Sequence, residues 1–127
     1  MIALQSLLYA ALAGYAGVNA LTGSRVYADI APQDALRPFV VWNEVSLVQA
    51  SDLSGSTETN GLNNYLVQVT SWSRTATQAR ELDYQIRLAM NAGAGFESVH
   101  RDTRSLGYEP DTKLYGHQSD FSIWIKT

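Results

Sequence analysis

The chain has 127 residues, of which 46% are hydrophobic and 17% charged, so it is long enough for one folded domain and too apolar for a disordered segment. Nine basic and twelve acidic residues give a net charge of −3 and lie scattered along the chain, which argues against a nucleic-acid-binding surface because such surfaces gather Lys and Arg. There is no cysteine, and this excludes both a disulfide scaffold and a thiolate metal site.

The opening segment, residues 1–24, carries no charged side chain. Its apolar residues recur at helical spacing, which predicts a helix over about residues 2–16 that fades at Gly14 and Gly17. A signal peptide or a membrane span is not expected, because no Lys or Arg precedes the apolar run and polar residues and glycines interrupt it.

The second face of this helix, which includes Tyr9 and Ala13, also lacks charge. A helix face exposed to water normally carries charged residues. The face is therefore expected either to lie beneath the rest of its own domain or to pack against another subunit. Because the charged fraction of the whole chain is low for a surface that meets only water, we expect partner subunits to cover part of it.

The next elements are strands. Residues 25–27 allow a short strand, and residues 31–38, with two prolines, indicate an irregular connection. Residues 39–48 are rich in β-branched and aromatic side chains and give the clearest strand. Strict alternation would place on one face the apolar residues Phe39, Val41, Val45 and Leu47.

A polar stretch at residues 51–61 predicts a long loop, and it carries Asp52, Leu53 and Glu58. Alternation over residues 65–72 predicts a second strand, paired with the first as a hairpin. The capping-box spacing that starts at Thr75 and the apolar stripe that follows predict a helix over residues 75–91.

On the polar side of that helix, Asp83 stands four residues before Arg87, which is typical of a solvated ion pair. Residues 96–108 suggest a polar extended segment, and residues 121–126 alternate as a last strand. We therefore predict one domain over residues 1–127 of α+β class, in the order α-β-β-α-β-β. Its antiparallel sheet would have about four strands, with two helices packed on one face.

Catalytic and metal sites find little support. His117, Ser119 and Asp120 include the residue types of a hydrolytic triad, but neighbours on one strand do not converge on a substrate. The histidines, His100 and His117, lie far apart without suitably spaced carboxylates, so no metal site is expected. We predict no catalytic residue and no cofactor, and interpret His117 as a loop or interface residue.

The three tryptophans are best explained by packing, because no basic residues flank them. Trp72 and Trp124 lie opposite the core stripes of their predicted strands. These two are therefore the tryptophans expected to contact a partner.

Three segments in this order and spacing resemble the tail-completion or tail-terminator proteins of long-tailed bacteriophages, which join the tail to the head. The resemblance spans nearly the whole chain and comes from their combination. The segments are Arg25-Val26-Tyr27 with Ala31-Pro32-Gln33 and Pro38-Phe39-Val40-Val41, then Tyr65-Leu66-Val67-Gln68-Val69 with Trp72-Ser73, and finally Tyr108-Glu109-Pro110 with Asp120-Phe121-Ser122-Ile123-Trp124.

The resemblance implies a structural virion subunit, assembled in a bacterial cytoplasm, at the head-proximal end of a tail. It implies a ring, usually a hexamer, that caps the tail tube and meets a head-neck connector, while DNA passes through its lumen without specific binding. The source would be a phage, a prophage or a gene-transfer particle.

Interface candidates are Tyr9, Ala13, Asp52, Leu53, Glu58, Trp72, His117 and Trp124. A head-closure or neck protein of the same particle remains an alternative. A small-ligand-binding domain would require His117, Asp120 and Glu109 to line a closed pocket.

Overall fold

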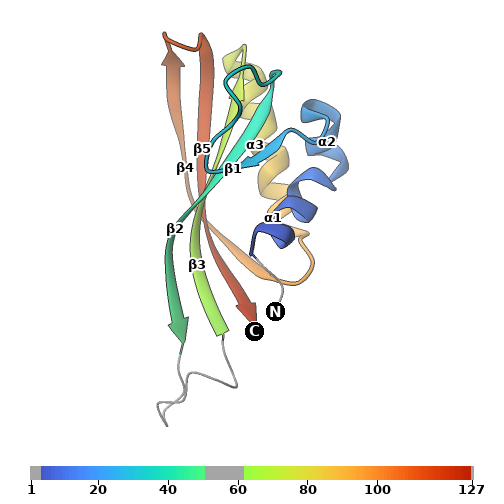
Figure 1. The fold of residues 1–127 in the computed structure, drawn as a ribbon, viewed down its shortest axis with the longest axis vertical. Coiled ribbons are helices and arrows are strands. Elements are labelled where there is room, and N and C mark those ends of the chain that lie inside the picture. The colour runs from blue at the N-terminus through green and yellow to red at the C-terminus, as the bar shows by residue number, and fades with distance from the viewer. Residues whose placement is uncertain (1–3, 51–61, 127) are drawn as a thin grey trace.

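The computed structural model describes residues 4–50 and 62–126. Within them, three helices pack on one face of a strongly twisted five-stranded sheet (Figure 1). No helix in these ranges is both long and apolar enough to span a membrane. The elements are α1 (Leu4–Ala13), α2 (Ala16–Thr22), β1 (Val26–Ala28), β2 (Phe39–Ala50), β3 (Leu62–Ser73), α3 (Ala76–Asn91), β4 (Glu97–Glu109) and β5 (Leu114–Lys126).

The strand order is β1-β2-β3-β5-β4. The α+β class, the antiparallel β2–β3 hairpin and the short strand near residues 25–27 are confirmed, but the prediction of a purely antiparallel sheet is wrong. Short β1 joins as a fifth strand and pairs in parallel with the start of β2, with Val26 opposite Val40 and Ala28 opposite Trp42. The sheet is therefore mixed, because the irregular connection after β1 carries the chain back to the end at which β1 began.

The single long helix predicted at the start of the chain is two helices. α1 ends at Ala13, and Tyr15 adopts an extended conformation before α2 begins at Ala16. α2 ends at Thr22 and is capped by Gly23, whose φ of 59° is left-handed and suits glycine. The sequence predicts that the helix fades at Gly14 and Gly17, but Val18 is fully buried, and this packing stabilises α2 despite Gly17 within it.

Helix α3 follows the prediction closely. The Thr75 hydroxyl accepts a hydrogen bond from the Gln78 amide at 3.1 Å and caps the helix. Its apolar stripe, which includes Leu82 and Ile86, is fully buried against the sheet. The expectation of a solvated Asp83–Arg87 pair is wrong for Asp83, whose side chain is 1% exposed, because it turns toward a hydroxyl of β5.

Both faces of the sheet carry apolar residues. The main core lies under the helices and includes Val40 and Trp42, whereas Phe39 and Val41 belong to a smaller cluster with Ala35 and Leu114. This smaller cluster lies on the opposite face, because successive strand residues alternate between faces.

The predicted shared face of Phe39, Val41, Val45 and Leu47 is wrong. The pairing of β2 with β3 shifts between Glu44 and Ser46, which leaves Val45 as the extra residue of a β-bulge. Beyond the bulge the alternation is reversed. Val45 and Leu47 are each 50% exposed.

Candidate functional site

The predicted interface residues do not form one patch. Tyr9 on α1 and Trp124 on β5 are exposed, whereas Trp72 and His117 are half-buried. Ala13 is buried in the main core and offers little surface to another subunit. Asp52, Leu53 and Glu58 fall outside the described residues.

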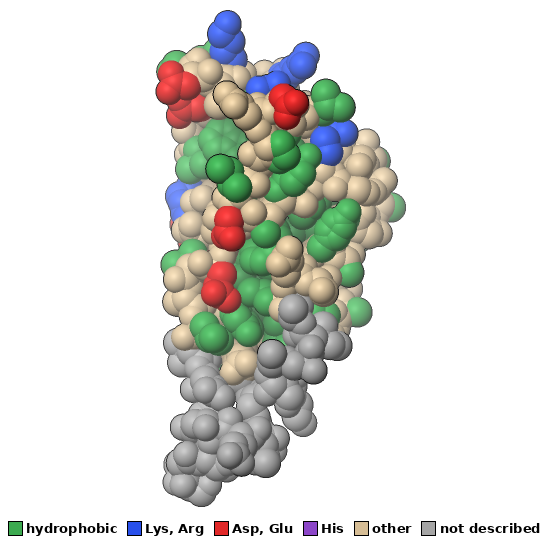
Figure 2. All heavy atoms as spheres, viewed as in Figure 1, with side chains coloured by type: hydrophobic (Ala, Val, Ile, Leu, Met, Phe, Trp, Pro, Cys, Tyr) green, Lys and Arg blue, Asp and Glu red, His purple; other side chains and the backbone are tan. Residues whose placement is uncertain are grey.

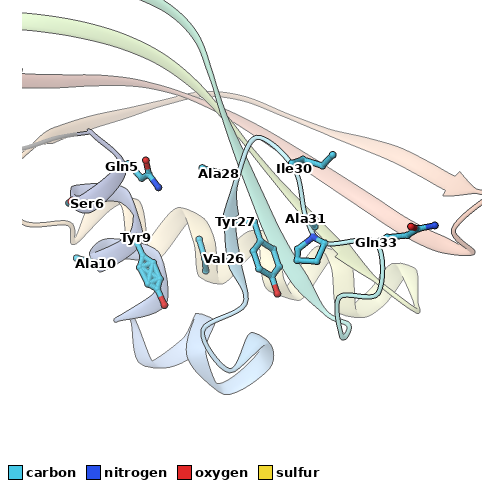
Figure 3. Close-up of a pocket in the computed structure, with 11 residues that line it drawn as sticks. Gln5, Ser6, Tyr9, Ala10, Val26, Tyr27, Ala28, Ile30, Ala31 and Gln33 are labelled. Carbon is cyan, nitrogen blue, oxygen red and sulfur yellow. The ribbon is translucent and has the colours of Figure 1, made fainter.

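A groove of ≈ 1080 Å³ runs beside α1. Figure 3 shows that α1 supplies one wall through Tyr9 and its neighbours, while β1 and the loop after it supply the other through Tyr27 and Ile30. None of the lining residues is charged; they are Gln5, Ser6, Tyr9, Ala10, Val26, Tyr27, Ala28, Ile30, Ala31, Pro32 and Gln33. Such an apolar surface suits contact with another protein.

On the sheet face away from the helices, a second hollow of ≈ 460 Å³ opens over the smaller apolar cluster. Phe39, Val41, Trp72 and Leu114 contribute its apolar lining. Trp72 lies directly over Gly116 on β5, where an added Cβ would come within 2.8 Å of the indole ring. Gly116 therefore makes room for the tryptophan.

A polar ladder crosses the same face beside this hollow. Arg104 on β4 donates to both carboxylate oxygens of Asp120 at 2.9 and 3.1 Å, and to Asp102 at 3.0 Å. It also donates to Gln118, which in turn donates to Thr70. The hydrogen bonds with Asp120 raise the pKa of the Arg104 guanidinium above its ordinary value. The ladder links β3, β4 and β5, and its carboxylates neutralise the positive charge of Arg104.

The residue types of a triad do not converge. The Ser119 hydroxyl is buried under α3 and donates to Asp83 at 2.6 Å, while Asp120 lies on the other face with Arg104. Glu109 lines the second hollow, but neither His117 nor Asp120 does. The arrangement required for the small-ligand alternative is therefore not present. In the described residues no three acidic or histidine side chains gather as a metal site would require.

The buried carboxylate of Asp83 belongs to a hydrogen-bonded chain between α3 and the sheet. Ser119 shares a second hydrogen bond with the hydroxyl of Thr103 at 2.7 Å, and Thr103 meets the His100 ring at 2.6 Å. Arg87 donates to the far oxygen of Asp83 at 3.1 Å. The sequence offered only the Asp83–Arg87 spacing, because the other contacts depend on the pairing of β4 with β5.

The sheet has open edges on both sides. β4 has no outer partner among the described strands, and its register shifts at two points, which leaves Arg101 and Leu106 as bulge residues. Charges and bulges of this kind protect an edge from pairing. On the other side, β1 pairs with β2 only as far as Trp42. The part of β2 beyond Asn43 has no outer partner in the described residues, and it exposes Leu47.

Comparisons with known proteins identify one family and one solved structure of similar fold. The model of the tail completion protein gp17 family matches residues 6–126. The fold is similar to a chain in a solved structure described as the virion of a native gene transfer agent particle, with a TM-score of 0.74, 18% identity, and coverage of 98% of this chain and 96% of that chain. A structure from Akkermansia muciniphila matches at a TM-score of only 0.41 and 6% identity, over 67% of this chain and 42% of that one. No curated protein matches in sequence.

Proposed function

We propose that this chain, which belongs to the tail completion protein gp17 family, forms a ring of about six copies that caps a tail tube and joins it to a head-neck connector. The family match over residues 6–126 carries the proposal, since it spans nearly all of the sequence. The fold that the chain shares with a component of a gene transfer agent particle supports a role in a phage or phage-derived particle. Membership of the family makes the chain a structural component of a virion rather than an enzyme.

A closed ring requires two different surfaces on each subunit that fit one another around a rotation axis. The groove beside α1 supplies one such surface, because it is uncharged and exposes Tyr9. The open part of β2, with Leu47 half-exposed and its backbone groups unpaired on the outer edge among the described residues, is the candidate for the second surface. β4 is a poorer candidate for strand pairing, since its bulges interrupt its edge.

The proposed path of DNA through the ring requires that the lumen does not hold the duplex. The net charge of −3 supports this, because an acidic subunit repels the phosphate backbone at long range. The proposed location is the head-proximal end of the tail, after assembly in the bacterial cytoplasm. The interface roles of Tyr9, Trp72, His117 and Trp124 are part of the same proposal.

The ring is tested by light scattering coupled to gel filtration, together with negative-stain images of purified particles. The expected result is a closed oligomer of uniform size, located at the end of the tail nearest the head. A strict monomer that is absent from particles would contradict the proposal. Deletion of the gene is expected to leave tails of uncontrolled length without heads, and normal infectious particles from the deletion strain would count against it.

Two substitutions test the lateral contact. Tyr9→Asp and Leu47→Asp each place a charge on a surface proposed to be buried between subunits, so both are expected to shift the oligomer toward monomer. Their melting temperatures as monomers should change little, because each side chain is about half exposed in one subunit. Tyr84→Asp, at a 47% exposed position of α3, is the matched control and should leave the oligomer intact.

A further inference from the structure

Three cationic side chains surround a small hollow of ≈ 390 Å³ at one end of the molecule. Arg37 comes from the loop before β2, Arg74 from the connection between β3 and α3, and Lys113 from the turn between β4 and β5. Figure 2 shows Lys and Arg side chains at the end opposite the grey segment, with Asp and Glu side chains beside them. Three segments far apart in the sequence thus bring their positive charges to one place.

These cations have no acidic partner inside the described part of the chain. The ion pairs found there involve Arg87 and Arg104 instead. The Nε atom of Arg37 is also buried, and it has no hydrogen-bond acceptor among the described residues. A buried donor without an acceptor is costly, and like charges held together repel. Both features indicate an anionic group that comes from outside the described residues.

The cationic hollow adjoins the second hollow on the uncovered face of the sheet. Thr112 and Leu114 line both. Leu114 is buried, and Trp72 and Phe39 extend the apolar wall beyond it. A ligand that filled both hollows would present a negative oxygen at one end and an apolar group beside it.

The acidic residues near the cationic hollow favour a single carboxylate over an extended polyanion. Asp34 lies three residues before Arg37, and Glu109 and Asp111 belong to the same turn as Lys113. These acids would repel an extended polyanion such as DNA, whose binding requires several phosphates to meet cations. None of these acids lines the cationic hollow, although Glu109 lines the second one. A single carboxylate in the cationic hollow can accept paired hydrogen bonds from an arginine.

We propose that the two hollows together dock a segment of a different protein subunit that carries an Asp or Glu side chain next to an apolar one. The carboxylate accepts hydrogen bonds from Arg37 and Arg74 and faces the Lys113 ammonium, while the apolar side chain lies against Trp72. The identity of the partner as a neighbouring ring of the particle rests on the proposed function. The chemistry of the site does not depend on it.

The experiment titrates the ¹⁵N-labelled full chain with a blocked peptide that carries one glutamate between two leucines, and it follows amide shifts by NMR. Saturable shifts are expected at residues 112–114 and at the Trp72 indole. The same peptide with glutamine in place of glutamate should bind at least about 10-fold more weakly, since hydrogen bonds to charged groups are stronger than hydrogen bonds between neutral groups.

Arg74→Gln should lower the affinity of the chain for the glutamate peptide by about 10-fold. Arg74 is exposed, so this variant is expected to fold normally. Arg80→Gln, at an exposed arginine of α3 that does not line the hollow, is the control and should bind as the original chain does.

Three outcomes would overturn the inference. They are an absence of shifts at these residues, equal binding of the glutamine peptide, and tighter binding of an oligothymidylate at the same salt concentration. Light scattering on the same samples separates this result from the proposed function. If the chain forms the ring but does not bind the peptide, only the docking site is refuted. If the chain binds the peptide but remains a strict monomer, only the ring is refuted.

Discussion

Replacing Asp83 by alanine tests the buried contact that fixes α3 to the sheet. Its carboxylate is 1% exposed and accepts a hydrogen bond of 2.6 Å from the Ser119 hydroxyl. A hydrogen bond to a charged group contributes about 1.5 to 3 kcal/mol. Arg87 is 38% exposed, so its ion pair adds only about 0.5 kcal/mol after screening by water.

The free energy of unfolding should therefore fall by about 2 to 4 kcal/mol in Asp83→Ala, part of which comes from the space left behind. For a chain of this length, the melting temperature should fall by roughly 10 °C. Urea unfolding followed by circular dichroism measures the first quantity, and calorimetry measures the second. A double-mutant cycle with Ser119→Ala should give a coupling energy of about 1 to 2 kcal/mol.

Asp102→Asn is the control for this prediction. Asp102 is 62% exposed and pairs with Arg104 on the open face of the sheet, so its loss should cost less than about 1 kcal/mol. The reasoning fails if the Asp83 and Asp102 variants lose similar stability, because burial would then not determine the strength of these carboxylate contacts.

Three further substitutions test other parts of the fold. Thr75→Ala removes the cap of α3 and should cost about 1 kcal/mol in urea unfolding, whereas Thr77→Ala in the first turn should cost less; equal losses would refute the cap. Gly116→Ala places a Cβ against the Trp72 ring and should cost about 1 to 3 kcal/mol with a change in near-ultraviolet circular dichroism; an unchanged spectrum and stability would contradict this packing. Arg104→Gln should cost less than about 1 kcal/mol, and the loss should shrink in high salt; a larger, salt-independent loss would argue against a screened surface ladder.

The elements with strong local signals were predicted correctly. The cap at Thr75 and the apolar stripe after it identified α3, because both depend on residues close together in the sequence. The hairpin of β2 with β3 followed from two alternating runs around a polar stretch. β4 was predicted only as a polar extended segment, since it is an edge strand with few buried side chains.

The errors arose where distant residues decide the structure. Val45 is an extra residue in β2, and nothing in its own segment reveals the bulge. Both faces of β2 carry apolar residues, so the sequence does not show which face packs against the helices. The parallel pairing of β1 depends on the path of residues 29–38, which local preference leaves open.

The candidate site was predicted less well than the fold. Trp72 and Trp124 were correctly placed opposite the main core. The sequence does not reveal the cationic hollow of Arg37, Arg74 and Lys113, because these residues are 37 and 39 positions apart in sequence and meet only in the folded chain. The basic residues are scattered along the sequence, but the fold brings these three together.

The strand order has a consequence for the rate at which the subunit becomes competent to assemble. β5 lies between β3 and β4, and it pairs with β3 from Leu62 opposite Lys126 to Ser73 opposite Tyr115. The centre of the sheet thus joins segments separated by an entire helix and a strand, and contacts so distant in sequence form slowly. During synthesis the sheet cannot close until residues 114–126 have left the ribosome. Nascent chains therefore expose the edge of β3 for that interval, and self-association at this stage would compete with folding.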